Sequence, residues 1–218
     1  MITSFGWQEA FFLVGSVRWT LLLTLIAFHG GGLLGGAIAL LRLARNPTVR
    51  WLATIYIQLI QSIPVLMVLF LAYYGLSLAG FDLPPLLAAA VSLGIYVSAY
   101  LAEIWRGAIE AVPFQQWEAS ASLALTRAQQ YRYVIIPQAL RMSLPPTVGF
   151  LVQLVKNTSI VSVVGFVELS RAGQLVNNAT FQPFKIFGVV ALVYFLICFP
   201  LSRLSRRLER VLHVGRPH

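Results

Sequence analysis

The chain has 218 residues, of which 58% are hydrophobic and only 11% are charged, and its mean hydropathy is +0.79. Because an ordinary soluble domain carries about a quarter of its residues as charged side chains, this composition excludes a soluble protein. The formal net charge of +9 does not indicate nucleic-acid binding, since the basic residues stand at the ends of apolar runs and not along one face.

The N-terminal residues contain Glu9 but no basic stretch and no small-residue cleavage site, so we expect no removable signal peptide. Apolar runs take up most of the remaining sequence and leave no segment for a polar domain. Residues 1–218 are therefore expected to form a single membrane domain. The single cysteine, Cys198, excludes a disulfide within the chain.

Five apolar runs are long enough to span a bilayer, since a helix needs about 20 apolar residues to cross a hydrocarbon core about 30 Å thick. The chain is therefore predicted to be an all-α membrane protein with five transmembrane helices. These are residues 19–41, 52–79, 86–105, 144–169 and 186–204. The fourth run contains the polar sequence KNTS at 156–159 and is the hardest to delimit.

The first span contains five glycines, Gly30, Gly31, Gly32, Gly35 and Gly36. Their overlapping G-x-x-x-G spacings are typical of a close approach between two membrane helices. The alternative is that they reflect only the higher glycine content of membrane helices.

Two residues of the second and third spans have expected structural roles. Pro64 predicts a kink in the second span, which would suit a gating helix. Glu103 lies at the inner end of the third span, and Arg106 follows it one turn later. We expect this pair to be mainly structural.

Arginine residues sort the loops into two sets. They follow the first, third and fifth spans, at positions 42, 45, 50, 106, 127, 132, 141, 203, 206, 207, 210 and 216. The loop near residues 81–85 has Asp82 and no basic residue, and residues 171–183 contain only Arg171. Because basic residues concentrate in cytoplasmic loops, the N-terminus is predicted to be periplasmic and the C-terminus cytoplasmic.

The cytoplasmic segment between the third and fourth spans, residues 107–143, is too long for a simple connector. Pro113 suits the first turn of a helix, and Thr126 followed by Gln129 fits a capping box that opens a second short helix. Pro137 is expected to end or bend that helix.

Apolar residues of the first short helix fall near one face: Phe114, Trp117, Ala121 and Leu125. Exposed aromatic side chains at helical spacing predict an anchor for a partner protein, because recognition of a helix in a groove needs such side chains. The alternative is a helix that lies on the lipid headgroups.

The run WEASASLALTRAQQYRYVIIPQALRMSLPP, residues 117–146, resembles the EAA loop of binding-protein-dependent ABC importer permeases. The family pattern opens with E-A-A, continues with a glycine and closes with I-x-L-P. Glu118 and Ala119 match the opening, and Ile135 and Pro137 match the close. Further segments resemble the polar amino-acid branch, at residues 61–75, 99–109, 155–174 and 180–184.

The resemblance implies a type I ABC importer permease fold in a bacterial inner membrane. It implies two permease subunits, identical or paralogous, an ABC ATPase dimer and a periplasmic solute-binding protein. The EAA loop would be the coupling helix seated in an ATPase groove, with Glu118 and Ala119 at the contact and Phe114, Trp117 and Leu125 filling the groove. The sequence lacks G-x-x-x-x-G-K-[ST], so ATP and Mg would be bound by the ATPase and no cofactor by this chain.

The sequence departs from the family pattern at Ala124, where the pattern has glycine. If that position needs a positive φ, alanine costs about 1 kcal/mol; alternatively, the turn is reshaped around Thr126. Asn157 stands where many relatives have aspartate, and Ser62-Ile63 where many have Gly-Thr before Pro64.

The resemblance implies transport of polar amino acids, with acidic amino acids or their amides as candidates. Such substrates carry charged groups, so the pathway needs polar side chains at membrane depth. The predicted pathway residues are Gln61, Pro64, Glu103, Lys156, Asn157, Thr158 and Ser159. Lys156 is expected to face the subunit interior or an aqueous cavity, or else to be satisfied by helix carbonyls or an intersubunit contact.

Two other classes of function compete with this interpretation. A membrane enzyme or metal site is disfavoured, because His29 stands alone among glycines and His213 and His218 lie in the tail. An ion- or proton-coupled carrier is the second alternative, although the five spans show no inverted repeat. Uptake by this chain alone would support the carrier, and co-purification with an ATPase would support the permease.

Overall fold

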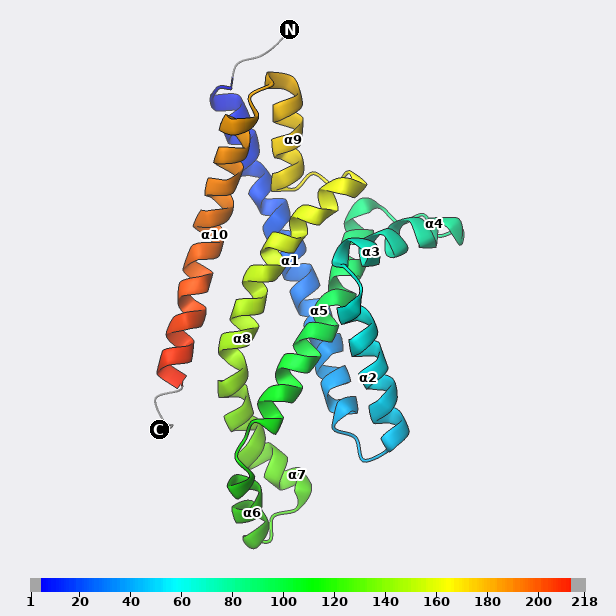
Figure 1. The fold of residues 1–218 in the computed structure, drawn as a ribbon, viewed down its shortest axis with the longest axis vertical. Helices are drawn as coiled ribbons and strands as arrows, with labels where there is room; N and C mark the ends of the chain where they lie inside the picture. Colours follow the sequence, from blue (N-terminus) through cyan, green and yellow to red (C-terminus); the bar gives the residue numbers. More distant parts are fainter. Residues whose placement is uncertain (1–4, 213–218) are drawn as a thin grey trace.

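The computed structural model describes residues 5–212, and every regular element in that range is helical. His213, Arg216 and His218 lie outside the described residues. Figure 1 shows the long helices running side by side along one axis. The helices are α1 (Trp7–Arg42), α2 (Pro47–Ser62), α3 (Val65–Phe70), α4 (Leu76–Leu78), α5 (Pro85–Glu110), α6 (Phe114–Ser122), α7 (Arg127–Gln129), α8 (Ile136–Asn157), α9 (Leu169–Thr180) and α10 (Pro183–Leu212).

Four continuous helices are long and apolar enough to cross a membrane: Trp7–Arg42, Pro85–Glu110, Arg127–Val164 and Pro183–Leu212. A fifth crossing exists only if α2 and the segment Val65–Leu78 are taken together as one bent span. The prediction of an all-helical membrane protein is confirmed. The count of five holds only with the bent pair included.

The second predicted span, residues 52–79, is not one straight helix, because the chain turns by 103° between α2 and α3. Ile63 is extended, with φ −102° and ψ 132°, and Pro64 precedes the first turn of α3. A proline disfavours helical backbone in the residue before it and lacks the N–H that would continue the helix. Figure 1 shows α3 and α4 running crosswise to α2.

The fourth predicted span, residues 144–169, is wrong at both ends. Its helix begins at Arg127, continues through a π-helical segment (Gln130–Ile135) into α8, and closes with a 3-10 segment (Thr158–Val164). Gly165 then adopts φ 85° and ends it. Pro137 does not end the helix, because it lies in the first turn of α8 directly after the π-helical segment.

The glycines of α1 form a close seam with α5. A Cβ built on Gly31 would lie 2.6 Å from the Gly94 carbonyl oxygen, and one on Gly35 would lie 2.8 Å from the Ser98 carbonyl oxygen. A Cβ on Gly30 would meet nothing within 4 Å. The predicted tight helix contact is therefore confirmed for two of the five glycines.

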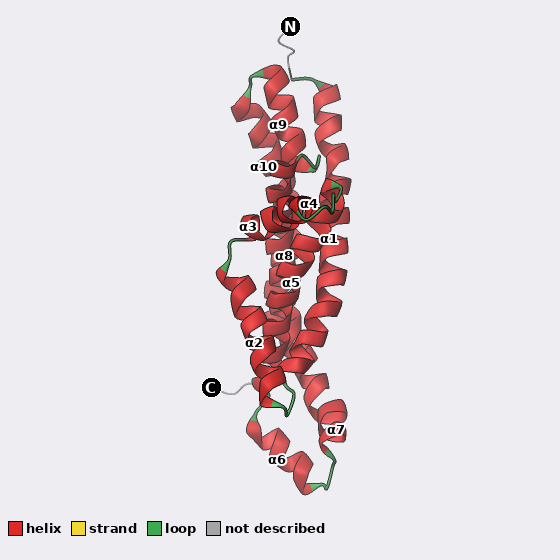
Figure 2. Cartoon of the chain, turned by 90° about the vertical axis from the view of Figure 1, so that its right-hand side faces the viewer, coloured by secondary structure: helices red, strands yellow, loops and turns green. Residues whose placement is uncertain are grey.

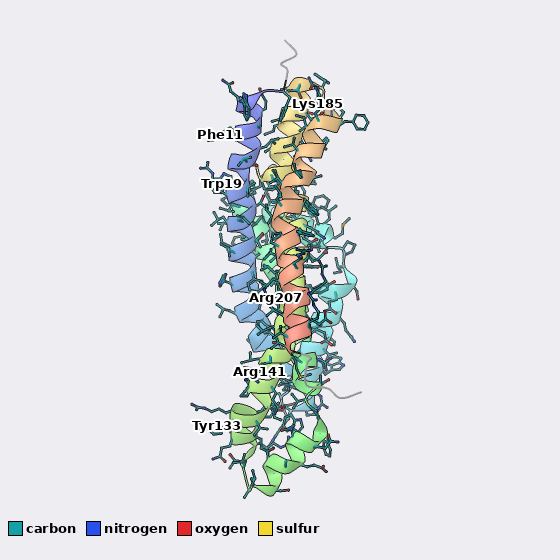
Figure 3. All side chains as sticks on the ribbon, turned by 90° about the vertical axis from the view of Figure 1, so that its left-hand side faces the viewer. Phe11, Trp19, Tyr133, Arg141, Lys185 and Arg207 are labelled. Carbon is teal, nitrogen blue, oxygen red and sulfur yellow. The ribbon has the colours of Figure 1, made fainter. Side chains whose placement is uncertain are left out.

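The two ends of the bundle carry different short helices. Figure 2 shows α9 near the end where the N-terminus lies, and α6 and α7 at the opposite end. In Figure 3, Phe11 and Lys185 lie at the α9 end, Arg141 lies toward the α6 end, and Arg207 lies between them on the lower part of α10. The α10 helix packs along α8 and also contacts α9.

Candidate functional site

The α6–α7 segment is a helical hairpin, and residues within the segment itself determine where its helices begin and how its turn closes. Pro113 precedes the first turn of α6, as its position in the sequence predicts. At the start of α7 the Thr126 N–H donates to Gln129 Oε1 at 2.8 Å, and the Gln129 N–H donates to Thr126 Oγ1 at 3.4 Å. The predicted capping box is confirmed. The Gln130 amide also donates to the Leu125 carbonyl oxygen at 2.9 Å, which closes the turn.

Ala124 occupies the left-handed region between the two short helices, with φ 56°. This is the conformation that glycine adopts without strain. Of the two alternatives for this turn, positive φ at residue 124 is the one that the structure bears out. Alanine therefore stands at a strained position in the exposed turn.

The predicted partner-binding residues divide into an exposed set and a half-buried set. Phe114 is 70% exposed, and Glu118 and Ala119 are also exposed. Trp117 is half-buried and makes an edge-to-face contact with Tyr131, with ring centroids 5.1 Å apart. Trp117 therefore holds the hairpin together, whereas Phe114 is available to another molecule.

The structure adds Leu123 to the exposed apolar side chains of the hairpin, at 75% exposure. Leu125, which was predicted to help fill the partner's groove, is half-buried. Helical spacing could not identify Leu123, because it lies in the turn after α6 ends. Its position next to Ala124, the glycine position of the loop pattern, is the signal that could have identified it.

An open groove of about 440 Å³ lies between the two arms of the hairpin. Its lining residues are Phe114, Trp117, Glu118, Ala121, Arg127 and Gln130. The groove combines an aromatic wall with one carboxylate and one guanidinium. Such a surface can contact a complementary protein through apolar burial and can select its orientation by charge.

Near the centre of the bundle, the break between α2 and α3 brings Gln61 against α5. The Gln61 amide donates to the Ala99 carbonyl oxygen at 3.5 Å. Five residues earlier on α2, the Tyr56 hydroxyl lies 2.7 Å from Ser98 Oγ. Of the predicted pathway residues, Gln61 and Pro64 therefore lie together at an interruption of the helix.

The polar run 156–159 lies where α8 changes to 3-10 geometry. Asn157 and Thr158 are buried, whereas Lys156 is exposed at the surface of the single chain. Gln153 donates to Asn157 Oδ1 at 3.2 Å, but Asn157 Nδ2 has no hydrogen-bond partner among the described residues. The Asn157 amide lies beside the Tyr96 hydroxyl of α5, and Lys156 does not point into the chain's interior.

The Glu103 carboxylate is paired with an arginine of its own helix. Arg106 Nε donates to Glu103 Oε2 at 3.0 Å, and the same guanidinium pairs with Glu110 one turn further on. The expected pairing of Glu103 with Arg106 is confirmed. These contacts account for the Glu103 carboxylate without a substrate.

An aromatic stack on α5 and α8 was not identified from the sequence. The rings of Tyr100 and Phe150 are stacked with centroids 5.4 Å apart, and Tyr96 lies 6.0 Å from Phe150. The stack belongs to the largest buried cluster of the chain. The spacing of Tyr96 and Tyr100, one turn apart, gave the only sequence signal.

Glu168 was also missed. It is fully buried and caps α9, accepting hydrogen bonds at 2.8 Å from the N–H groups of Ser170 and Arg171. The Tyr194 hydroxyl of α10 donates to it at 3.0 Å. Burial nevertheless raises the pKa of the Glu168 carboxyl above its usual value, because desolvation outweighs these hydrogen bonds.

The adjoining backbone ties α9 to α1. The Leu169 N–H donates to Thr20 Oγ1 at 3.1 Å, and both residues are fully buried. Three helices therefore meet at one buried polar site. A carboxylate directly before a helix is a capping signal that the sequence offers, but the partners on α1 and α10 are visible only in the fold.

One continuous helix connects the exposed hairpin to the buried polar run. It extends from Arg127 to Val164 and includes Asn157 near its far end. The helical rise places Arg127 and Asn157 about 45 Å apart. A single helix therefore joins the hairpin to the buried polar run.

The sequence profile of the family described as "Binding-protein-dependent transport system inner membrane component" matches residues 31–214. The chain is 38% identical to the probable glutamine ABC transporter permease protein GlnM of Bacillus subtilis, over 88% of this chain and 90% of that protein. It is 34% identical to the glutamine transport system permease protein GlnP of Escherichia coli, over 94% of each.

A solved structure described as "Crystal structure of an amino acid ABC transporter with histidines" superposes with a TM-score of 0.87. The two sequences are 36% identical, and the match covers 91% of this chain and 93% of the other. The likeness therefore extends over most of the fold.

Proposed function

Since the chain belongs to the family of binding-protein-dependent transport system inner membrane components, as an amino-acid ABC transporter permease subunit, we propose that it carries polar amino acids into the cytoplasm. The proposed substrates include acidic amino acids or their amides, because two relatives of nearly equal length are named as glutamine permeases. The chain is an integral membrane protein, and its proposed location is the bacterial inner membrane.

The observation that carries this proposal is the α6–α7 hairpin. Phe114 and Leu123 leave large apolar surfaces uncovered, and Glu118 and Ala119 are exposed beside them. A chain with no nucleotide-binding loop needs a separate ATPase, and this hairpin is the proposed contact with it. Binding of ATP and Mg belongs to that partner.

The proposed orientation places the hairpin in the cytoplasm. Arg141 lies toward the α6 end of the bundle, and the arginine-rich turn between α1 and α2 follows the lower end of α1 in Figure 1. Basic residues concentrate on the cytoplasmic side of membrane proteins. The α9 end and the N-terminus would then face the periplasm and the substrate-binding protein.

The proposed transport step follows from the continuous helix between Arg127 and Val164. Closure of an ATPase dimer would move two hairpins together, one from each permease subunit, and the helix would carry this motion to Asn157. The buried Asn157 amide and Gln61 beside the α2–α3 break are the proposed polar groups of the pathway. The second subunit is proposed to be either a copy of this chain or a paralogue.

The experiment that tests the coupling role is the substitution Glu118→Lys. It should abolish binding-protein-dependent uptake of glutamine into proteoliposomes and prevent co-purification of the ATPase, because it replaces the one carboxylate of the hairpin groove with a positive charge. Membrane insertion should be unchanged, since the Glu118 side chain supports no other part of the fold. Normal uptake by this variant would overturn the proposal.

The matched control is Gln115→Lys, which adds a positive charge to α6 outside the groove residues. Gln115 is exposed on the same helix. This variant should retain most of the uptake and the ATPase. Equal loss in both variants would show a general effect of charge, and the groove would lose its proposed role.

A carrier driven by an ion or proton gradient is the alternative function. The family match and the uncovered hairpin both disfavour it, because such a carrier needs no docking surface at this position. Proteoliposomes that contain the permease without an ATPase discriminate the two functions. Gradient-driven uptake in those vesicles would support the carrier.

A further inference from the structure

A second groove lies between three membrane helices, apart from the hairpin. It has a volume of about 260 Å³ and is lined by Gly36, Ala39 and Leu40 of α1, Trp105 and Ile109 of α5, and Ile136, Ala139, Leu140 and Ser143 of α8. The small side chains on α1 and α8 leave space that the larger residues surround. The proposed coupling mechanism makes no use of this space.

The groove offers nothing to a polar ligand. Ser143 Oγ donates to the Leu140 carbonyl oxygen at 3.0 Å, and Trp105 Nε1 donates to Thr147 Oγ1 at 3.1 Å. The two polar side chains of the lining are therefore already satisfied. The remaining lining is apolar, so hydrocarbon is the chemistry that it fits.

The rim of the groove is uncovered and lies near one surface of the bilayer. Leu40 is 66% exposed and Leu140 is 59% exposed. Leu40 precedes Arg42, the last residue of α1, by two positions, or about 3 Å along the helix. The groove is therefore located at the depth where lipid chains meet their headgroups on the arginine-rich side.

Positive charge flanks the apolar rim. Arg141 directly follows Leu140, is exposed, and has no ion pair within residues 5–212. Arg132 precedes Ile136 by one turn, and its guanidinium lies 5.6 Å from the centre of the Tyr133 ring. The nearby Glu110 is already paired with Arg106. An anionic headgroup complements this arrangement.

We propose that this groove binds one acyl chain of an anionic phospholipid, with the lipid phosphate beside Arg141. The membrane supplies this ligand, and the proposed orientation assigns it to the inner leaflet. A bound chain would fill the space between α1 and α8. It would thus cover the first membrane-buried turns of the helix that the hairpin is proposed to move.

The test uses the transporter purified with its ATPase and native mass spectrometry of retained lipid. Phosphatidylglycerol should remain bound in preference to phosphatidylcholine. Arg141→Gln should reduce the bound phosphatidylglycerol about fivefold, as expected for the loss of one arginine near a lipid surface. Arg207→Gln, an exposed arginine on α10, should retain it. Equal retention of both lipids, or equal loss in both variants, would overturn the proposal.

The acyl chain is tested separately with Leu140→Trp, which should plug the groove and displace the lipid. Leu196→Trp is the control, because Leu196 is 61% exposed on α10 and lies outside the groove. A photoreactive group at Leu140 should cross-link to lipid. A cross-link to a second permease or to the ATPase would overturn the proposal, and so would displacement of the lipid by free glycerol phosphate.

The experiment also separates this inference from the coupling role. Glu118→Lys should lose the ATPase but keep the bound phosphatidylglycerol. Loss of both would show that the groove depends on the assembled complex and would contradict a site formed by α1, α5 and α8 of this chain.

Discussion

The two ends of the bundle have short helices of similar size but opposite construction. At one end, α6 leaves Phe114 largely exposed, and its turn is held by local hydrogen bonds between Thr126 and Gln129. At the other end, α9 is held by the buried Glu168, which reaches Tyr194 of α10. One end is stabilised by its own sequence neighbours, and the other by distant helices.

This difference indicates what each end can do. Another molecule can bind Phe114 and Leu123 because both are largely exposed. Trp117 packs into the buried cluster formed by the end of α5 and the start of α8, so the hairpin is tied to those two helices. Displacement of α9 would expose a buried carboxylate and leave the Leu169 N–H without its Thr20 acceptor. If a partner moves the hairpin as proposed, the α9 end is suited to remain fixed.

The largest expected effect that tests this contrast comes from Glu168→Ala. The variant should be less stable by about 3 kcal/mol, because two helix N–H groups and a buried hydroxyl lose their acceptor. Glu118→Ala at the hairpin should change stability by less than about 0.5 kcal/mol. Unfolding of the purified permease in detergent measures both. Similar losses in the two variants would remove the distinction between the ends.

The seam between α1 and α5 joins the two ends, so it should be as intolerant of change as the α9 end. Gly35→Ala should destabilise the fold by about 2 kcal/mol, because its Cβ would collide with the Ser98 carbonyl oxygen. The matched Gly30→Ala has free space around the added methyl group and should be neutral or slightly stabilising. Equal thermal stability of the two variants would contradict the close seam.

The sequence predicted the hairpin better than the α9 end, for a physical reason. The capping box at Thr126 and the turn at Ala124 depend on residues a few positions apart, so the chain itself contains the whole signal. The Glu168 site depends on Thr20 and Tyr194, which only the fold brings together. Long-range contacts of this kind leave no spacing that can be read from one sequence.

The membrane spans show the same limit of prediction from one sequence. Apolar length predicted the crossing helices, but it could not show that Pro64 turns the chain by 103° or that the helix of the fourth span begins at Arg127. Hydropathy indicates whether a segment lies in lipid or in water, but it does not give the direction in which the chain runs. A proline inside a predicted span is not by itself evidence of a break. Pro64 marks one, whereas Pro145 and Pro146 lie inside the continuous α8.

Both ends contain a non-glycine residue with positive φ, and these positions should respond alike. Ala124 has φ 56° and Phe181 has φ 54°. Ala124→Gly should stabilise the chain by about 1 kcal/mol at most, because relief of strain is partly offset by the greater freedom of glycine in the unfolded chain. Phe181→Gly should gain a similar amount, since Phe181 is 71% exposed. Melting temperatures compare them, and a loss of stability in Ala124→Gly would show that the alanine methyl group makes a contact of its own.

The smallest expected effect is the pH dependence that the buried carboxyl gives the α9 end. Because burial raises the pKa of Glu168 in the folded chain, the unfolded chain releases its proton first as the pH rises. The contribution of Glu168 to stability is therefore fully present below the usual glutamate pKa and is lost as the pH rises through the folded value. Glu168→Gln cannot titrate and should lack this slope.

Melting temperatures of the wild type and Glu168→Gln between about pH 4 and about pH 8 measure the difference. The wild type should lose stability relative to the variant as the pH rises through the raised pKa, while Glu118→Gln at the hairpin should track the wild type. A wild type that gains stability relative to Glu168→Gln over this range would mean that the capping hydrogen bonds outweigh the cost of burial. The carboxylate would then stabilise α9 through its charge, and the fixed end would depend on ionisation.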